Sequence, residues 1–390
     1  MKPPSPTSRA DALLLATTIA LLIGGLGMVF TASAYIDAVE FGRSYATVLK
    51  QAVATIGGLV IMFVLARTPY RKLRTWWKYV AGAWILSLFG MGAVLVFGRE
   101  INGAKRWINI GPVNVQPSEF VKFTSLLLAA VAIDKFRDRV NDKHFLGIFG
   151  FGAFWPLALL VLQKDLGTIV ILCGMLLMML FLAGLSGRIV AALFGSGIGL
   201  VALLIAIEPY RMRRITTLFD PFADCTNDGY QVCQSLVAFH NGGLRGQGAG
   251  EGYATLDYLP EAHNDFIAAV IGEQAGFLGI LLLITMFAVF TWRGVTTAHA
   301  AKDFFGFLLS ATITLMIAGQ ACMNLGVALG LFPNKGLVLP FLSYGGSAMV
   351  VNLAAVGVLL AVSAGNPRTA PATSMGAAEV TVTQRSSTGA

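Results

Sequence analysis

Charged residues are scarce in this sequence of 390 residues, because Asp, Glu, Lys and Arg together make up only 12% of it. That is about half of the share usual in soluble globular domains. Hydrophobic residues make up 56%, the mean hydropathy is +0.72, and the apolar residues fall in blocks of about twenty, the length with which a helix crosses a bilayer. The composition excludes a water-soluble globule and a disordered chain. It indicates an all-α polytopic membrane protein.

Cysteine and histidine are also rare, with four of each. Four cysteines are too few for a disulfide framework, and Cys173 and Cys322 lie within apolar blocks, where a thiol acts as a small hydrophobe. Cys225 and Cys233 lie between such blocks and can pair only in an oxidising compartment, so their disulfide stays an open question at this point. The scattered histidines show no spacing typical of metal ligands.

Ten apolar segments, bounded by charged or turn residues, predict ten transmembrane helices within residues 12–364. The segments are 12–33, 46–66, 79–97, 119–134, 145–163, 167–185, 189–207, 265–291, 304–325 and 347–364. Residues 1–11 are interpreted as an N-terminal tail. Residues 365–390, rich in Ser, Thr, Ala and Gly, are predicted to form a disordered C-terminal tail.

Basic residues predict the orientation of these helices. The net charge is +8, and clusters of Lys and Arg at 67–78 and 135–143 flank short loops, as is typical of the cytoplasmic side. Both termini are then cytoplasmic, and the basic charge needs no nucleic-acid partner. Three polar segments face outward, namely 98–118, 326–346 and the large loop 208–264 between helices seven and eight. Long connections on one face of a bundle are often functional.

The outward segments combine cations with glycine-rich backbone. The cations include Lys105, Arg106, Arg214, Arg245 and Lys335, and glycines gather at 242–250 and in Gly345 and Gly346. Cations beside exposed backbone N–H groups suit a phosphate or pyrophosphate ligand. Contact with lipid headgroups is an equally good interpretation of any single arginine.

Charged residues within the apolar segments also need an explanation, because each is costly inside a bilayer. Glu119 and Lys122 are three residues apart on one helix face, which predicts an ion pair. Asp165 is expected to begin a helix. Glu273 is expected to be paired inside the bundle or to face a cavity.

Residues 258–266 are the most informative segment. Pro260 suits a first helical position, and Glu261 and Asp265 then lie four residues apart on one face at the helix mouth. A carboxylate there, close to cations, suits a general base acting on a hydroxyl. The helix N-terminus works against this role, since it lowers the pKa of a carboxylate, and partial desolvation would have to offset that effect.

Residues 11–365 resemble the shape, elongation, division and sporulation (SEDS) family of peptidoglycan glycosyltransferases. The matching motifs are Gly103–Ile108, Gln116–Glu119, Asp228–Gln231, Tyr258–Phe266 and Asn334–Ser347. Pro-Glu-Ala-His before Asp265, and Lys335 before Gly336, look more like the division branch than the elongation branch. The resemblance implies a ten-helix fold with a large outer loop.

The resemblance also implies polymerisation of lipid II, with Asp265 as the catalytic base and with Glu119 and Lys122 as a functionally important pair. We expect one base and several cations to suffice, because the lipid pyrophosphate is a good leaving group once its charge is neutralised. The residues expected to contact the substrate are Arg106, Lys105, Arg214, Arg245, Glu261, His263, Lys335, Ser343, Tyr344, Gly345 and Gly346.

No tightly bound cofactor is expected, and a divalent cation such as Mg²⁺ or Mn²⁺ is an alternative source of positive charge. The expected partners are the nascent glycan strand, a class B penicillin-binding protein and other membrane proteins of the division machinery. The expected location is the inner membrane at the septum, with a periplasmic active site. Two departures from the family pattern are Lys164, where proline is usual, and Ala254-Thr255, where a Gln-Lys pair is common.

Three alternatives remain open at the level of the sequence. The first is a transporter of the same lipid, which would place charged groups near the bilayer midplane; here they gather toward the outer surface. The second is a polymerase for elongation or sporulation, because those branches share the motifs. The third is an inactive scaffold for a transpeptidase, which the presence of Asp265 disfavours.

Overall fold

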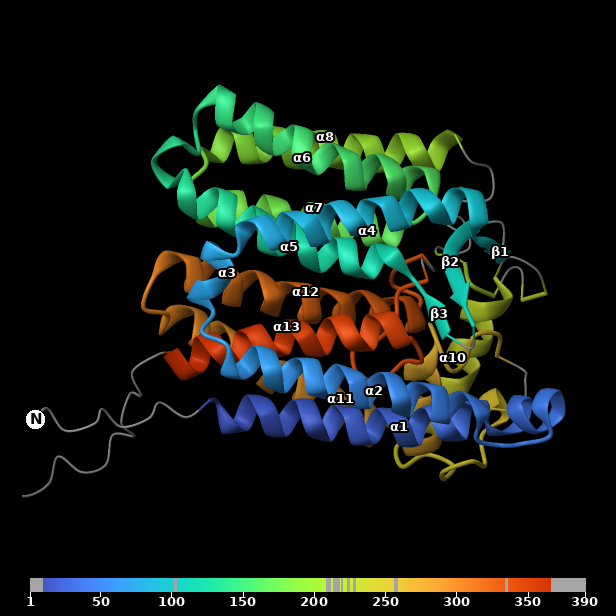
Figure 1. The fold of residues 1–390 in the computed structure, drawn as a ribbon. Coiled ribbons are helices and arrows are strands. Elements are labelled where there is room, and N and C mark those ends of the chain that lie inside the picture. Colours follow the sequence, from blue (N-terminus) through green and yellow to red (C-terminus); the bar gives the residue numbers. More distant parts are fainter. Residues whose placement is uncertain are drawn as a thin grey trace, which may run out of the picture.

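The computed structural model describes residues 10–101, 104–111, 113–207, 212, 218, 220–222, 225–226, 229–255, 259–333 and 336–365. Most of these residues are helical, and the long helices run side by side with a small sheet at one end (Figure 1). We call this end the sheet end. The opposite end carries the short helix α3 (Arg71–Thr75) and is called the α3 end.

Each segment predicted to cross the membrane coincides with a helix. These helices are α1 (Ala12–Phe41), α2 (Ala46–Arg67), α4 (Trp77–Phe97), α5 (Pro117–Lys135), α6 (Lys143–Leu162), α7 (Leu166–Leu182), α8 (Gly187–Ile207), α11 (Ile267–His299), α12 (Phe304–Ala328) and α13 (Gly346–Gly365). Most boundaries agree within a few residues. Helix α1 continues beyond residue 33 to Phe41, where Gly42 ends it in the left-handed conformation (φ 65°).

Among the described residues, eight helices are long and apolar enough to cross a membrane. The two other helices of the predicted set are α5, which contains the charged residues Glu119, Lys122, Asp134 and Lys135, and α7, which has only 17 residues. A helix satisfies its own backbone hydrogen bonds, as a segment in lipid requires. The chain is therefore a polytopic helical membrane protein.

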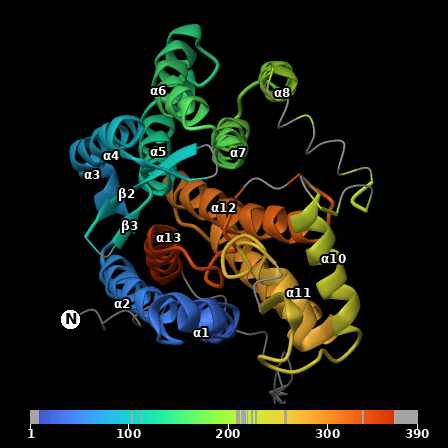
Figure 2. The same cartoon turned by 90° about the vertical axis from the view of Figure 1, so that its right-hand side faces the viewer.

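Helices α12 and α13 form the centre of the bundle, and most of their residues are buried. Helix α2 packs very closely on α13, because a Cβ atom at Gly357 would lie only 2.6 Å from the backbone oxygen of Met62. Helix α8, in contrast, is not buried: all its residues are at least partly exposed. It lies at the edge of the bundle, beyond α7 (Figure 2).

The sheet is antiparallel, with strand order β1 (Arg99–Ile101), β2 (Ala104–Ile110) and β3 (Val113–Val115). Strands β2 and β3 pair Ile108 with Val115 and Ile110 with Val113. The structure as a whole is mostly helical, as expected, but the sequence analysis did not predict the sheet within the polar segment 98–118. Its two three-residue strands are too short to give a period-two pattern in the sequence.

The large loop also contains regular structure that the sequence analysis did not predict. Helix α10 (Tyr230–Gly242) and the 3₁₀-helix η2 (Tyr253–Thr255) lie within it, and α10 lies at the sheet end beside α11 and α12 (Figures 1 and 2). The hydroxyl of Ser235 on α10 donates a hydrogen bond of 2.6 Å to the carbonyl of Ala328 at the end of α12. Part of this loop is thus fixed to the bundle.

Candidate active site

Asp265 and Arg106 face the same glycine at the sheet end. A Cβ atom built on Gly336 would lie 3.1 Å from Nη1 of Arg106 and 3.5 Å from Oδ2 of Asp265. Gly336 has a φ of 65°, a conformation that glycine adopts without strain. A carboxylate and a guanidinium from distant parts of the chain therefore both lie close to Gly336.

Arg106 extends toward Gly336 from strand β2, and the turn before α7 holds its guanidinium group. Its Nη2 donates a hydrogen bond of 2.7 Å to the carbonyl of Lys164. Lys164 has a φ of 56°, and the next residue, Asp165, caps α7 by accepting a hydrogen bond of 3.2 Å from the backbone N–H of Thr168. The prediction that Asp165 begins a helix is confirmed, and its turn orients the guanidinium.

Asp265 is held by Asn324, a residue that the sequence analysis did not single out. The side-chain amide of Asn324 donates to the carbonyl of Asp265 at 2.8 Å and to the carbonyl of Leu337 at 2.6 Å. Asn324 is buried, and two carbonyl acceptors require its NH₂ group on this side. It ties Asp265 to the segment that contains Gly336. An isolated asparagine inside an apolar run gives no signal of this contact.

The expectation that Pro260 takes a first helical position is wrong, although the predicted start of the eighth span, residue 265, lies within two residues of the start of α11. Residues 260–265 form turns, and α11 begins at Ile267. Glu261 has a φ of 58°, which excludes it from a right-handed helix, and its carboxylate accepts a hydrogen bond from the side chain of Asn264. Glu261 and Asp265 therefore do not share a helical face. Asp265 thus lies in the turn that precedes α11 and not in the helix itself.

His263 and Tyr344 lie together in the turn before α11 and the segment before α13. The backbone N–H of Tyr344 donates a hydrogen bond of 2.8 Å to the carbonyl of His263, and the centroids of their rings are 5.8 Å apart. Burial lowers the pKa of His263, although the nearby carboxylates of Glu261, Asp37 and Glu40 raise it. The imidazole is therefore neutral at pH 7.

Ser343 and Gly345 have structural partners. The hydroxyl of Ser343 accepts a hydrogen bond of 2.8 Å from the backbone N–H of Leu339. The buried side chain of Gln51 donates to the Ser343 carbonyl at 3.1 Å and accepts from the Gly345 N–H at 3.1 Å. These contacts fix the segment before α13, and Gly346 begins that helix. The Gly345 N–H is engaged by Gln51, so it is not presented to a phosphate.

The predicted ion pair between Glu119 and Lys122 is confirmed. Nζ of Lys122 lies 2.8 Å from Oε1 of Glu119, and both side chains are almost fully buried in the first turns of α5. The backbone N–H of Gln116, just before this helix, donates to the hydroxyl of Ser347 on α13 at 2.9 Å. The pair thus lies on the inside of the bundle at the sheet end.

The glycine run 246–250 does not present its backbone as an open phosphate site, which corrects that interpretation. The backbone N–H groups of Gln247 and Gly248 donate to the carbonyls of Glu273 and Gln274, at 3.0 and 3.1 Å. These carbonyls are available because α11 is interrupted at Gly276, whose φ of 66° and ψ of −164° are not helical. The glycines allow the loop to approach the broken helix closely.

Glu273 is fully buried within α11, and the expectation that it is paired inside the bundle is confirmed. Its carboxylate accepts hydrogen bonds from the backbone N–H groups of Tyr253 and Ala254, at 3.0 and 2.9 Å. Glu273 therefore fixes η2, which contains Ala254 and Thr255, the two residues that differ from the Gln-Lys pair common in the family. Arg245 is exposed beside Gly276, about 14 Å along α11 from its start. It is not brought together with Asp265.

Arg214 and Lys335 lie outside the described residues. Lys105 precedes Arg106 on strand β2, and adjacent strand residues point to opposite faces; its Cα pairs across the sheet with that of Glu100. Among the described residues, no group of three His, Cys, Asp or Glu side chains is arranged to hold a metal ion.

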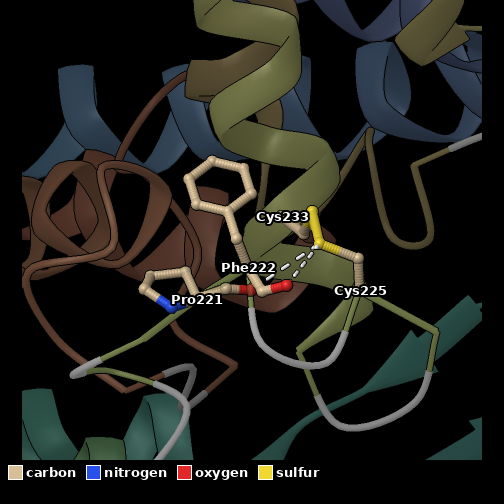
Figure 3. The surroundings of a disulfide bond; sticks show 4 residues. All are labelled: Pro221, Phe222, Cys225 and Cys233. Atoms are coloured by element: carbon tan, nitrogen blue, oxygen red, sulfur yellow. Dashed lines mark hydrogen bonds between the residues drawn. A yellow bond between two sulfur atoms is a disulfide. The ribbon is translucent and has the colours of Figure 1, made fainter.

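Cys225 and Cys233 form a disulfide (Figure 3). The bond joins the described residues 225–226 of the large loop to the first turn of α10, where Cys233 is buried. The sulfur of Cys225 also lies 3.8 Å from the carbonyl oxygens of Pro221 and Phe222. The disulfide, the sheet and Asp265 are all at the same end of the bundle.

Comparison with known proteins gives concordant matches. The family model described as "Cell cycle protein", FtsW/RodA/SpoVE, matches residues 11–367. The "Probable peptidoglycan glycosyltransferase FtsW" of Trichlorobacter lovleyi is 38% identical, over 94% of this chain and 96% of the relative. The "Stage V sporulation protein E" of Bacillus subtilis is 37% identical, over 90% of this chain and 96% of the relative.

Two solved structures share the fold. One, described as "Structural coordination of polymerization and crosslinking by a peptidoglycan synthase complex", contains a chain with a TM-score of 0.73 and 28% identity, covering 91% of this chain and 97% of that one. The other is the rod shape determining protein RodA of Thermus thermophilus, with a TM-score of 0.66 and 28% identity, covering 92% of this chain and 98% of that one.

Proposed function

Because the chain belongs to the FtsW, RodA and SpoVE family of cell cycle proteins, we propose that it polymerises lipid II into glycan strands as a peptidoglycan glycosyltransferase of cell division. The relatives named FtsW support the activity and the division branch. The observation that carries the site assignment is the approach of Arg106 and Asp265 to Gly336. This approach supports a site in which Asp265 acts as base beside the cation Arg106.

The proposed mechanism uses Asp265 as general base. Its carboxylate takes the proton of the acceptor hydroxyl while the hydroxyl oxygen attacks the anomeric carbon of the growing strand. The bond between that carbon and the lipid pyrophosphate breaks, and the configuration at the carbon inverts. Arg106 stabilises the negative charge that the leaving pyrophosphate gains, so no general acid is needed.

A divalent cation is compatible with this site. Magnesium is usually held by one or two carboxylates together with substrate phosphates, and Asp265 can be such a carboxylate. A bound cation would add to the charge neutralisation that Arg106 provides. Lys105, Arg245, Lys335 and Arg214 remain proposed contacts for more distant parts of the lipid-linked substrate.

We further propose ten membrane crossings, cytoplasmic termini and a periplasmic active site at the septum. The basic clusters at 67–78 and 135–143 belong to the α3 end, in keeping with a cytoplasmic location. The disulfide belongs to the sheet end, in keeping with an oxidising compartment. A class B penicillin-binding protein and other division proteins are the proposed partners. The similarity to a chain of a peptidoglycan synthase complex supports the former.

The test is glycan-strand formation from labelled lipid II by the purified chain together with its transpeptidase partner. We expect Asp265→Ala and Asp265→Asn to abolish polymer while the thermal unfolding temperature stays unchanged. Glu251→Gln is the matched control, because Glu251 is an exposed carboxylate of the same loop region, and it should leave the rate unchanged. Equal polymer from wild type and Asp265→Asn would refute the assignment of the base.

The transporter alternative predicts a different result in the same preparation. If wild type makes no polymer but moves labelled lipid II across liposome membranes, the polymerase proposal is wrong. The charged pair Glu119–Lys122 lies in the first turns of α5 at the sheet end. A transporter is expected to place such groups near the midplane, so the polymerase is the better-supported function.

A further inference from the structure

Aromatic side chains and lysines gather at the α3 end, on the opposite end of the bundle from Asp265. Trp76 and Trp77 join α3 to α4, and their exposed fractions are 43% and 44%. Nζ of Lys72 lies 5.6 Å from the ring centroid of Trp76, and Nζ of Lys135, at the end of α5, lies 5.8 Å from that of Trp77. We call Lys72, Trp76, Trp77 and Lys135 the lysine–tryptophan cluster.

Helix α3 has an anchoring side and a free side. Arg71 donates a hydrogen bond of 2.7 Å to Asp303, and Nε of Arg74 lies 2.9 Å from Oδ2 of Asp134, so these two arginines attach α3 to neighbouring segments. Lys72 is four residues before Trp76 and shares a different face with it. The fold therefore uses the arginines for its own stability and presents the lysine outward.

The two lysines carry charge that no described acidic side chain neutralises through an ion pair. Both side chains are exposed, and neither forms an ion pair with any residue that the structure describes. Lys135 also lies 5.6 Å from the ring of Phe136, which is 40% exposed. Each ammonium group thus rests on an aromatic face and retains its capacity to bind an anion.

We propose that the lysine–tryptophan cluster binds the headgroup phosphate of an anionic phospholipid. Helix ends mark the level of the bilayer interface, where tryptophan rings lie against the glycerol and upper acyl region. Basic residues between helix ends bind anionic headgroups at the same level. Lys72 and Lys135 contact the phosphate, and Trp76 and Trp77 contact the lipid body. The proposal is independent of the glycosyltransferase activity.

The test measures lipid retention by native mass spectrometry of the purified full chain, with dioleoylphosphatidylglycerol as probe and dioleoylphosphatidylcholine as neutral reference. We expect wild type to retain phosphatidylglycerol preferentially. The double variant Lys72→Gln/Lys135→Gln should lose about thirtyfold in affinity for it, as two basic contacts at a membrane surface imply. Both positions are exposed, so the variant should fold normally.

Lys50→Gln is the matched control, because Lys50 makes a similar contact of 5.4 Å with the ring of Phe41 at the sheet end. It should retain phosphatidylglycerol as wild type does. The proposal is overturned if the double variant retains the lipid like wild type or if Lys50→Gln loses as much affinity. It is also overturned if soluble glycerol phosphate displaces the lipid at equal concentration, because the ligand is then a free phosphate.

Discussion

Lys122 carries its charge in the interior of the bundle, and the carboxylate of Glu119, on the same helix, lies 2.8 Å from its ammonium group. Removing one member of a buried pair leaves an uncompensated charge, which typically costs about 3–5 kcal/mol, whereas replacing both members is often close to neutral. The pair is therefore more sensitive to single than to double substitution.

We expect Lys122→Met to lower the free energy of unfolding by about 3–5 kcal/mol and the double variant Glu119→Gln/Lys122→Met to lower it by much less. Denaturant unfolding of the detergent-solubilised chain measures both. Equal losses in the two variants would mean that the pair does not act as a unit. If the double variant is stable but inactive in glycan synthesis, the pair has a functional role besides its structural one.

Asn324 acts on the site through two backbone carbonyls, so its contribution is to position Asp265 and Gly336. We expect Asn324→Leu to reduce the rate of glycan polymerisation at least tenfold. Two lost hydrogen bonds are worth about 1 kcal/mol each in stability, so the variant should remain folded. Saturating lipid II should not restore the rate, because the loss concerns the base and not substrate affinity.

Gln320 provides the comparison for Asn324. It lies one turn away on α12, is buried, and its side-chain amide makes no hydrogen bond within the described part of the chain. Gln320→Leu should therefore polymerise lipid II nearly as fast as wild type. An equal loss of rate in both variants would show that replacing any buried polar residue in this part of α12 by leucine is damaging. Asn324 would then have no special role.

Asp303 joins three elements at the α3 end. It caps α12 by accepting from the Gly306 N–H at 2.8 Å, and it accepts from the Tyr70 hydroxyl at 3.0 Å and from Arg71 at 2.7 Å. Burial raises the pKa of Asp303, but these hydrogen bonds and the charge of Arg71 outweigh it, so the pKa lies below its ordinary value. The ionised carboxylate is thus the form that stabilises the fold.

The sign of the resulting pH dependence follows from the lowered pKa. The stabilisation is fully present above the ordinary pKa of about 4 and is lost as the pH falls through the lower folded value. Asparagine caps helices as well as aspartate does, so Asp303→Asn isolates the charge. We expect its unfolding temperature to lie below that of wild type at pH 7 and the difference to shrink at pH 3.

Asp138→Asn, in the 3₁₀-helix η1 (Arg137–Arg139), serves as control for this measurement, because Asp138 is exposed at the same end. It should unfold like wild type at both pH values. A difference between wild type and Asp303→Asn that grows toward pH 3 would contradict the stated direction of the pKa.

At the scale of elements, the sequence located the long helices well, but it did not predict the turn that precedes α11. The apolar blocks are as long as the bilayer requires, so their positions follow from composition alone. The turn at residues 260–265 was predicted as helix because Pro260 and the carboxylate spacing suit one. A turn forms instead, because Glu261 has a positive φ and its carboxylate accepts a hydrogen bond from the side chain of Asn264. The backbone N–H of Tyr344 also donates to the carbonyl of His263 within this turn.

The orientation of the whole molecule can be tested by labelling single cysteines in a chain whose four native cysteines are replaced. We expect Glu251→Cys, at the sheet end, to react with a membrane-impermeant maleimide in spheroplasts, and Ser186→Cys, between α7 and α8, to react only after lysis. Both positions are exposed. Labelling of Ser186→Cys in spheroplasts would reverse the proposed orientation.

The sequence by itself determined the membrane class, the positions of the long helices and the pair Glu119–Lys122, because each depends on neighbours within a few turns or on the bilayer thickness. The tertiary structure alone decided that Arg106, Asp265 and Gly336 meet and that Asn324 joins two of their segments. It also decided that the glycine run serves the broken helix α11. These contacts join segments far apart in the chain, and no local periodicity encodes which distant segment a turn, a strand or a buried amide will meet.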